Sequence, residues 1–368
     1  MQRPRFSFQC LPLLALLAFA MIGCKDPVEY NYDKATLLTD VAHGQILPSA
    51  AEFLIAADSL EGAAEAFVAA VDSVQLAALK AQWEVTVLKW KTCEVDDFGV
   101  AKDSYLSGRI GKWPCDPAII EGKIAGTDSM DAAFFQNLGA TARGLYAIEY
   151  LLFEHDPATT LTEFTSSQFA LRRLTYLRGV ATEVHSKAQE WHDLWSTAPE
   201  HYAHEWANSS ATGLEDPAGL LVNGIISVLE EVTKVKVGKP FGKFDLGILH
   251  PESVESPRTG ISLALFRANL NSLEAIFRGT SETGLEQALD ELHASYGEAA
   301  LSSAIAQQFA AANHAMDQIT MPFQDALINQ HQQVEDLYQA LKALTVLFKA
   351  DVSSAMSITV TVSDTDGD

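Results

Sequence analysis

The segment Gly144-Leu145-Tyr146-Ala147-Ile148-Glu149-Tyr150-Leu151-Leu152-Phe153 has the composition of an apolar helix that carries two polar groups one turn apart. Because residues three apart share a face of a helix, the phenol of Tyr146 and the carboxylate of Glu149 are expected to point at the same ligand. We predict that the segment lies late in a long helix that begins at Asp128 and is stopped by Asp156-Pro157. The core face of this helix is expected to comprise Phe134, Leu138, Leu145, Ile148 and Leu152.

Apolar residues recur at helical spacing on both sides of this segment. Steps of 3, 4, 4 and 3 residues separate the first set, and steps of 3, 4, 3 and 4 residues separate the second. The two sets are Leu76, Leu79, Trp83, Val87 and Trp90, and Leu263, Phe266, Leu270, Leu273 and Phe277. Four long helices are enough to close a bundle, so we predict an all-α fold of two packed helical bundles. The first bundle is expected over residues 35–207, the second over residues 208–351, and an acidic tail over residues 352–368.

The N-terminal residues indicate export. Arg3 and Arg5 precede an apolar run from Leu11 to Ala20, which is short for a membrane helix and typical of a signal peptide. The order Met-Ile-Gly-Cys at the end of this run favours a lipoprotein signal peptide over residues 1–23, with Cys24 as the lipidated first residue and a linker over residues 24–34. The alternative is an ordinary signal peptide that happens to contain a cysteine. Lys25, in place of an aspartate, favours sorting to the outer membrane, where the protein would face the periplasm or the cell surface.

The charge of the chain limits its partners. Its formal net charge of −23 argues against binding nucleic acid and against binding an anionic leaflet through the surface of the protein. A surface of this kind is compatible with attracting cations, but the need for solubility explains it equally well. Attachment to the membrane is therefore expected through the acyl chains on Cys24.

Two cysteines remain in the exported chain, Cys93 and Cys115. An even pair of cysteines in an oxidising compartment favours a disulfide bond. We predict that this bond joins the end of a helix to the glycine- and proline-rich loop that follows it.

Several short motifs occur in an order that resembles the imelysin-like family of exported bacterial proteins. The central motif is Gly144-x-Tyr146-x-x-Glu149, where the family signature has histidine at the position of Tyr146. The other matching segments are Trp83, Trp90, Glu94, Phe98-Gly99, Trp113-Pro114, Leu221-x-Asn223, Val237-Gly238-Lys239-Pro240 and Glu255-Ser256. The resemblance implies a helical fold of two bundles, a functional site where the bundles meet and a role in iron uptake.

The resemblance also suggests a set of oxygen ligands for iron or another divalent or trivalent cation. Phenolate and carboxylate oxygens suit hard cations, and tyrosine can hold ferric iron. The predicted metal ligands are Tyr146, Glu149, Glu94, Asp97 and Glu255, with Gly144, Ser256 and Arg258 as further site residues. Two alternatives are purely structural, namely that Tyr146 packs at the interface with one hydrogen bond to a neighbour and that Arg258 pairs with a carboxylate.

We therefore predict a lipid-anchored, non-enzymatic binding protein that acts in iron uptake together with iron-transport proteins. Members of the family were once grouped with metallopeptidases, so a metallopeptidase is one alternative. Helical zinc peptidases use a His-Glu-x-x-His motif, which this chain lacks, and Tyr146 removes the nitrogen ligand of the family signature. The other alternative is a scaffold that docks a partner protein and binds no metal.

Overall fold

The computed structural model describes residues 31–196, 202–280 and 283–361. The predicted signal peptide, the lipidation site at Cys24, most of the linker and the end of the acidic tail lie outside these ranges. Within the ranges, no helix is both long enough and apolar enough to cross a bilayer.

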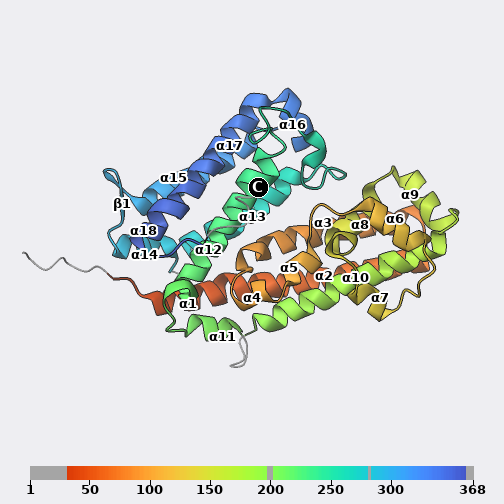
Figure 1. Cartoon of the computed structure of the whole chain (residues 1–368), viewed down its shortest axis with the longest axis horizontal. Helices are drawn as coiled ribbons and strands as arrows, with labels where there is room; N and C mark the ends of the chain where they lie inside the picture. Colours follow the sequence, from red (N-terminus) through yellow and green to blue (C-terminus); the bar gives the residue numbers. More distant parts are fainter. Residues whose placement is uncertain (1–30, 197–201, 281–282, 362–368) are drawn as a thin grey trace, which may run out of the picture. The chain divides into compact units, whose positions relative to one another are not determined.

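Helices dominate the first half of the chain, and four of them, α2, α3, α8 and α10, pack together (Figure 1). The helix α3 begins where its stripe of apolar residues begins, because the Asp72 side chain accepts hydrogen bonds from the backbone N–H groups of Val74 and Gln75. The helices of this half are α1 (Lys34–Val41), α2 (Leu47–Ala69), α3 (Ser73–Cys93), α4 (Val100–Asp103), α5 (Leu106–Ile110), α6 (Pro117–Ala125), α7 (Ala132–Gln136), α8 (Gly144–Phe153), α9 (Pro157–Thr165), α10 (Ala170–Leu194) and α11 (Tyr202–Ala207).

The second half forms another helical set, in which α12, α13, α15 and α17 make the main contacts. Its helices are α12 (Pro217–Glu230), α13 (Ser262–Arg278), α14 (Leu285–Glu291), α15 (Leu301–Asp317), α16 (Phe323–Asn329), α17 (His331–Val346) and α18 (Ser353–Ala355). Gly279 ends α13 with a positive φ of 78°, a conformation that glycine adopts readily at the end of a helix. The all-α prediction is confirmed, although a two-residue hairpin of β1 (Ser295–Tyr296) and β2 (Ala299–Ala300) lies between α14 and α15.

The two sets pack against each other, chiefly through α13 and α3 (Figure 1). Residues from Tyr32 onward cluster as one compact unit. At one point along the junction, Lys34 of α1 pairs with Asp216 at the start of α12, with 2.8 Å between Nζ and Oδ2. The chain therefore brings polar groups from both halves within reach of each other.

The prediction of one long helix that begins at Asp128 and is stopped by Asp156-Pro157 is wrong. The chain instead forms α7, a 3₁₀ turn at Ala140–Ala142 and then α8, which starts at Gly144. Gly144 has φ +75°, and a Cβ atom there would lie 2.4 Å from the carbonyl oxygen of Ile110. Only glycine fits this close approach without strain, so the central motif opens a helix and does not lie late in one.

The structure does not contain the predicted disulfide, because Cys93 and Cys115 are both free thiols. Cys93 is fully buried at the end of α3, where its environment includes Ser49 and Asp96. Cys115 is half-buried beside Arg258 and Glu149. The two side chains therefore lie in different surroundings, and the loop between them is organised by α4 and α5 in place of a covalent link.

Candidate functional site

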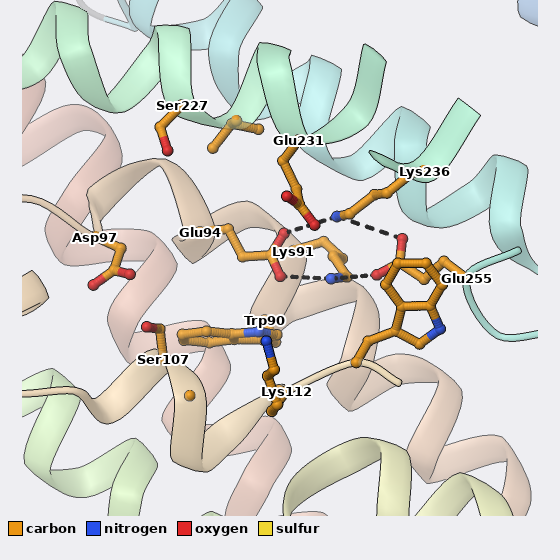
Figure 2. Close-up of a pocket in the computed structure, with 14 residues that line it drawn as sticks. Trp90, Lys91, Glu94, Asp97, Ser107, Lys112, Ser227, Glu231, Lys236 and Glu255 are labelled. Atoms are coloured by element: carbon orange, nitrogen blue, oxygen red, sulfur yellow. Dashed lines mark hydrogen bonds and ion pairs between the residues drawn. The ribbon is translucent and has the colours of Figure 1, made fainter. Parts of the chain in front are cut away.

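Four charged side chains from both helical sets form a closed cluster at the junction (Figure 2). Lys91 and Glu94 come from the end of α3, and Lys236 and Glu255 come from the second half. We call these four residues the charge ring. Lys236 lies in a π-helical segment, Glu231–Gly238, that continues α12. π-helical turns are uncommon and occur often at functional sites, and this one directs Lys236 toward α3.

Each carboxylate of the charge ring contacts both ammonium groups. The Lys91 Nζ atom lies 2.5 Å from Glu94 Oε1 and 2.7 Å from Glu255 Oε1. Lys236 Nζ lies 3.4 Å from the other oxygen of each carboxylate, Glu94 Oε2 and Glu255 Oε2. Because buried charges are costly unless they are paired, the alternation of two cations and two anions is what permits this cluster to exist in the interior.

Tyr146 and Asn269 extend the charge ring with hydrogen bonds. The Tyr146 hydroxyl group donates to Glu255 Oε1. The Asn269 side chain donates to Glu94 Oε2 over 2.9 Å and accepts from Lys236 Nζ over 3.2 Å. The charge ring and these two hydrogen-bonded neighbours thus join α3, α8, the π-helical segment and α13.

The protonation states follow from this geometry. Burial alone would raise the pKa of Glu94, but the nearby ammonium groups of Lys236 and Lys91 outweigh burial and lower this pKa to about 2. The same two lysines lower the pKa of Glu255 against the effect of its burial. Burial and the neighbouring carboxylates raise the pKa of Tyr146 well above its usual value. Tyr146 is therefore a neutral phenol that donates a proton to a carboxylate, and it is not a phenolate.

Glu149 lies next to this cluster but has different partners. Its Oε2 atom accepts a hydrogen bond of 3.2 Å from the Ser256 hydroxyl group, and its buried Oε1 atom has no hydrogen-bond partner among the described residues. Burial raises the pKa of Glu149 to about 7, although the positive charge of Arg258 acts in the opposite direction. Ser256 has a positive φ of 50°, a conformation that non-glycine residues adopt rarely and most often at functional sites.

Two cavities open beside these residues. The first has a volume of about 310 Å³ and is lined by all four members of the charge ring and the aromatic ring of Trp90, among others. The second has a volume of about 370 Å³ and is lined by Tyr146, Glu149 and Arg258, among others. Lys112, Trp113 and Glu231 line both, so the two cavities adjoin. Their sizes are those of small-molecule binding sites.

The structure brings some of the predicted site residues together and separates others. Tyr146, Glu94 and Glu255 belong to one hydrogen-bonded cluster. Asp97 does not contact the charge ring through a hydrogen bond or an ion pair; it lines the first cavity, and burial raises its pKa. Arg258 forms an ion pair with Glu154. The structural alternative for Arg258 was a pair with a carboxylate, and Glu154 is that carboxylate. The contribution of Gly144 is the backbone turn that starts α8.

The charge ring does not fit a bare metal ion. Each of the four oxygen atoms of Glu94 and Glu255 already lies beside a lysine ammonium group, and Tyr146 is protonated. Among the described residues, no group of three or more His, Cys, Asp and Glu side chains is arranged to hold a metal ion. Of the predicted oxygen ligands, Glu94 and Glu255 are thus occupied by internal cations.

Sequence reasoning missed Lys91, Lys236 and Asn269. Lys91 could have been found, because Lys91 and Glu94 are three residues apart in a helix, a spacing at which opposite charges pair. Lys236 and Asn269 gave no such signal. The contacts of both residues with Glu94 span more than a hundred residues of sequence, so only the packing of the two helical sets reveals them.

The fold and the site together define an all-helical protein of two sets with a buried charged cluster where the sets meet. The family model described as imelysin matches residues 46–348, so the chain belongs to the imelysin family. The match includes the glycine, tyrosine and glutamate of the central motif. No curated protein matches the chain.

Two solved structures have a similar fold, each with a TM-score of 0.70. One is a candidate iron-regulated protein A precursor from Parabacteroides distasonis ATCC 8503, which is 21% identical and aligns over 88% of this chain and 94% of that chain. The other is an imelysin-like protein from Psychrobacter arcticum 273-4, which is 19% identical and aligns over 91% of this chain and 100% of that chain. At these identities the likeness establishes the fold.

Proposed function

We propose that the chain is an envelope-anchored, non-enzymatic binding component in iron uptake. It holds an iron-containing ligand in the two adjoining cavities at the junction of the helical sets. Lipidation of Cys24 anchors it to the outer membrane, and iron-transport proteins are its partners.

The observation that supports this proposal most strongly is the origin of the charge ring. Both halves of the chain contribute buried charged groups to the wall of a cavity, where a purely structural core would have apolar side chains. Burying two lysines and two glutamates costs desolvation free energy that well-packed apolar residues would not require. We infer that binding a polar ligand is the reason this arrangement is retained. The family membership and the iron-regulated relative support iron as the proposed cargo.

Iron binding to the purified full chain tests the proposal. Iron would be supplied as the free ion and as ferric citrate, and the iron that stays with the protein after gel filtration would be measured alongside titration calorimetry. We expect stoichiometric binding of at least one form and roughly tenfold weaker binding by Trp113→Ala, which removes a wall that the two cavities share. Failure of both forms to bind would overturn the proposal.

One observation favours peptide hydrolysis as a second candidate. Glu149 has an unpartnered buried oxygen and a pKa raised to about 7, which are properties that suit a general base near neutral pH. Incubation of the protein with unfolded casein, with and without chelator, tests this candidate. Cleavage that the chelator blocks and Glu149→Gln abolishes would support it, and intact casein in every sample would exclude it for this substrate.

A further inference from the structure

The charge ring disfavours a free cation, whereas the second cavity has groups that attract an anion. Inside the ring, each ammonium group lies within 3.4 Å of both carboxylates, so a cation that entered would have to displace a lysine that is already paired. The two positive and two negative charges of the ring balance each other, and every carboxylate oxygen of the ring lies within 3.4 Å of an ammonium group.

The second cavity instead presents ammonium groups that are not paired. Lys112 and Lys239 both line it, and in the described part of the chain neither side chain forms a hydrogen bond or an ion pair. Both residues are exposed, so their charges are accessible from solvent. The lining also holds the carboxyl groups of Glu149, Glu231 and Glu252, of which Glu149 accepts a hydrogen bond from Ser256 and Glu252 lies 3.3 Å from His250. The two unpaired ammonium groups favour an anion on their side of the cavity.

We infer that the cavities take iron as an anionic complex with an organic acid rather than as a bare cation. Lys91 and Lys236 exclude the free cation, and Lys112 and Lys239 attract the negative charge of the complex. The cavity volumes of about 310 and 370 Å³ suit a small complex of this kind. This inference rests on the proposed function and specifies the form in which the iron is bound.

The first experiment compares ferric citrate with citrate alone by titration calorimetry on the full chain. We expect ferric citrate to bind and the double variant Lys112→Gln/Lys239→Gln to bind it roughly tenfold more weakly. The matched control is Lys102→Gln/Lys342→Gln, which removes two lysines that line neither cavity and should leave the affinity unchanged. Equal affinities of the double variant and the wild type, or of citrate and ferric citrate, would overturn the inference.

The second experiment tests the exclusion of free cations. Tb³⁺ is a hard trivalent ion whose luminescence is sensitised by nearby tryptophan, and Trp90 lines the first cavity beside the ring. The wild type is expected to give no saturable signal. Lys236→Met and, separately, Lys91→Met should give one, because each frees carboxylate oxygens. Lys236→Arg, which keeps the charge, and Lys89→Met, which removes a surface lysine paired with Glu52, should behave like the wild type.

The outcomes separate this inference from the proposed function. Saturable Tb³⁺ binding by the wild type that Glu255→Gln abolishes would overturn the inference and leave an iron-binding role intact. The inference would also be overturned if neither methionine variant gave a saturable Tb³⁺ signal although circular dichroism showed both to be folded. The wild-type titration with its Glu255→Gln comparison does not depend on the methionine variants, so it tests the inference even if they do not fold. Absence of binding by every form of iron would overturn the proposed function itself.

Discussion

At the scale of single residues, the buried carboxyl group of Glu149 should make stability depend on pH. Its pKa of about 7 lies above the usual value of 4.5, so the folded state binds this proton more tightly than the unfolded state does. Its stabilising contribution is therefore complete below about pH 4.5 and is lost as the pH rises through 7. At 1.36 kcal/mol per pKa unit, the loss amounts to roughly 3 kcal/mol.

We expect Glu149→Gln to remove this pH dependence. Glutamine stays neutral, so the variant should resemble the wild type at pH 4.5 and be more stable by up to roughly 3 kcal/mol at pH 8. Urea unfolding of both proteins at the two pH values measures the difference. The exposed Glu84→Gln on α3 is the control. Parallel pH profiles for the wild type and Glu149→Gln would contradict the burial of an ionisable Glu149.

A second prediction concerns the hydroxyl group of Tyr146. Tyr146→Phe removes the hydrogen bond to Glu255 Oε1, which still keeps its contact with Lys91 at 2.7 Å. Since no buried acceptor loses all its partners, the free energy of unfolding should fall by only about 1.5 kcal/mol, the lower end for a hydrogen bond to a charged group. Urea denaturation measures this change, with Tyr296→Phe on the exposed hairpin as the control. A loss as small as that of the control would show that the hydroxyl group does not bind the ring.

These residues also show how much of the site can be predicted from the sequence. The spacing of Tyr146 and Glu149 on one helix was readable, and the family motifs pointed to Glu94 and Glu255 as neighbours. The spacing of Lys91 and Glu94 predicts an ion pair, but Lys236 cannot be recognised as a site residue from the sequence, because a lysine is ordinarily exposed. Tertiary packing determines which groups Glu94 and Glu255 contact. Because these groups are lysines, the carboxylates belong to an ion-pair cluster and not to a metal site.

At the scale of elements, the start of α8 depends on Gly144. Gly144→Ala would place a methyl group against the backbone carbonyl of Ile110 in a left-handed conformation, and backbone atoms cannot move aside cheaply. We expect a loss of roughly 2 kcal/mol or more in the free energy of unfolding, measured by urea denaturation. The matched control is Gly122→Ala in the exposed middle of α6, where no atom lies within 4 Å of the new methyl group. The control should be stabilised by about 0.5–1 kcal/mol, and a similar effect at Gly144 would contradict the geometry.

The elements also show where sequence patterns succeed and fail. The stripes of α3 and α13 predicted these helices because each has an uninterrupted apolar face that is buried on one side. The pattern across Leu138 and Leu145 failed, since a spacing of seven residues suits one continuous helix as well as two helices joined by a tight turn. The left-handed turn at Gly144 is imposed by the neighbouring α5, which the local sequence cannot reveal.

At the scale of the whole molecule, the two helical sets should unfold as one cooperative unit. The helix α13 packs on α3, and separating the sets would leave Lys91 and Glu94 without their partners Lys236 and Glu255. Breaking a buried ion pair by removing one partner costs roughly 3–5 kcal/mol, so a half-unfolded state is disfavoured. The chain offers a direct reporter, because all six tryptophans lie between residues 83 and 206, in the first set.

A substitution in the second set should therefore shift the tryptophan signal of the first. Phe309→Ala in α15 empties a buried position between Phe277 and Phe348 and should cost roughly 3–5 kcal/mol. If the sets unfold together, the urea midpoint measured by tryptophan fluorescence falls as far as the midpoint measured by circular dichroism at 222 nm. Phe67→Ala in α2, its counterpart in the first set, should also move both midpoints together. A fluorescence midpoint that stays at the wild-type value in Phe309→Ala would mean that the charge ring does not couple the two halves.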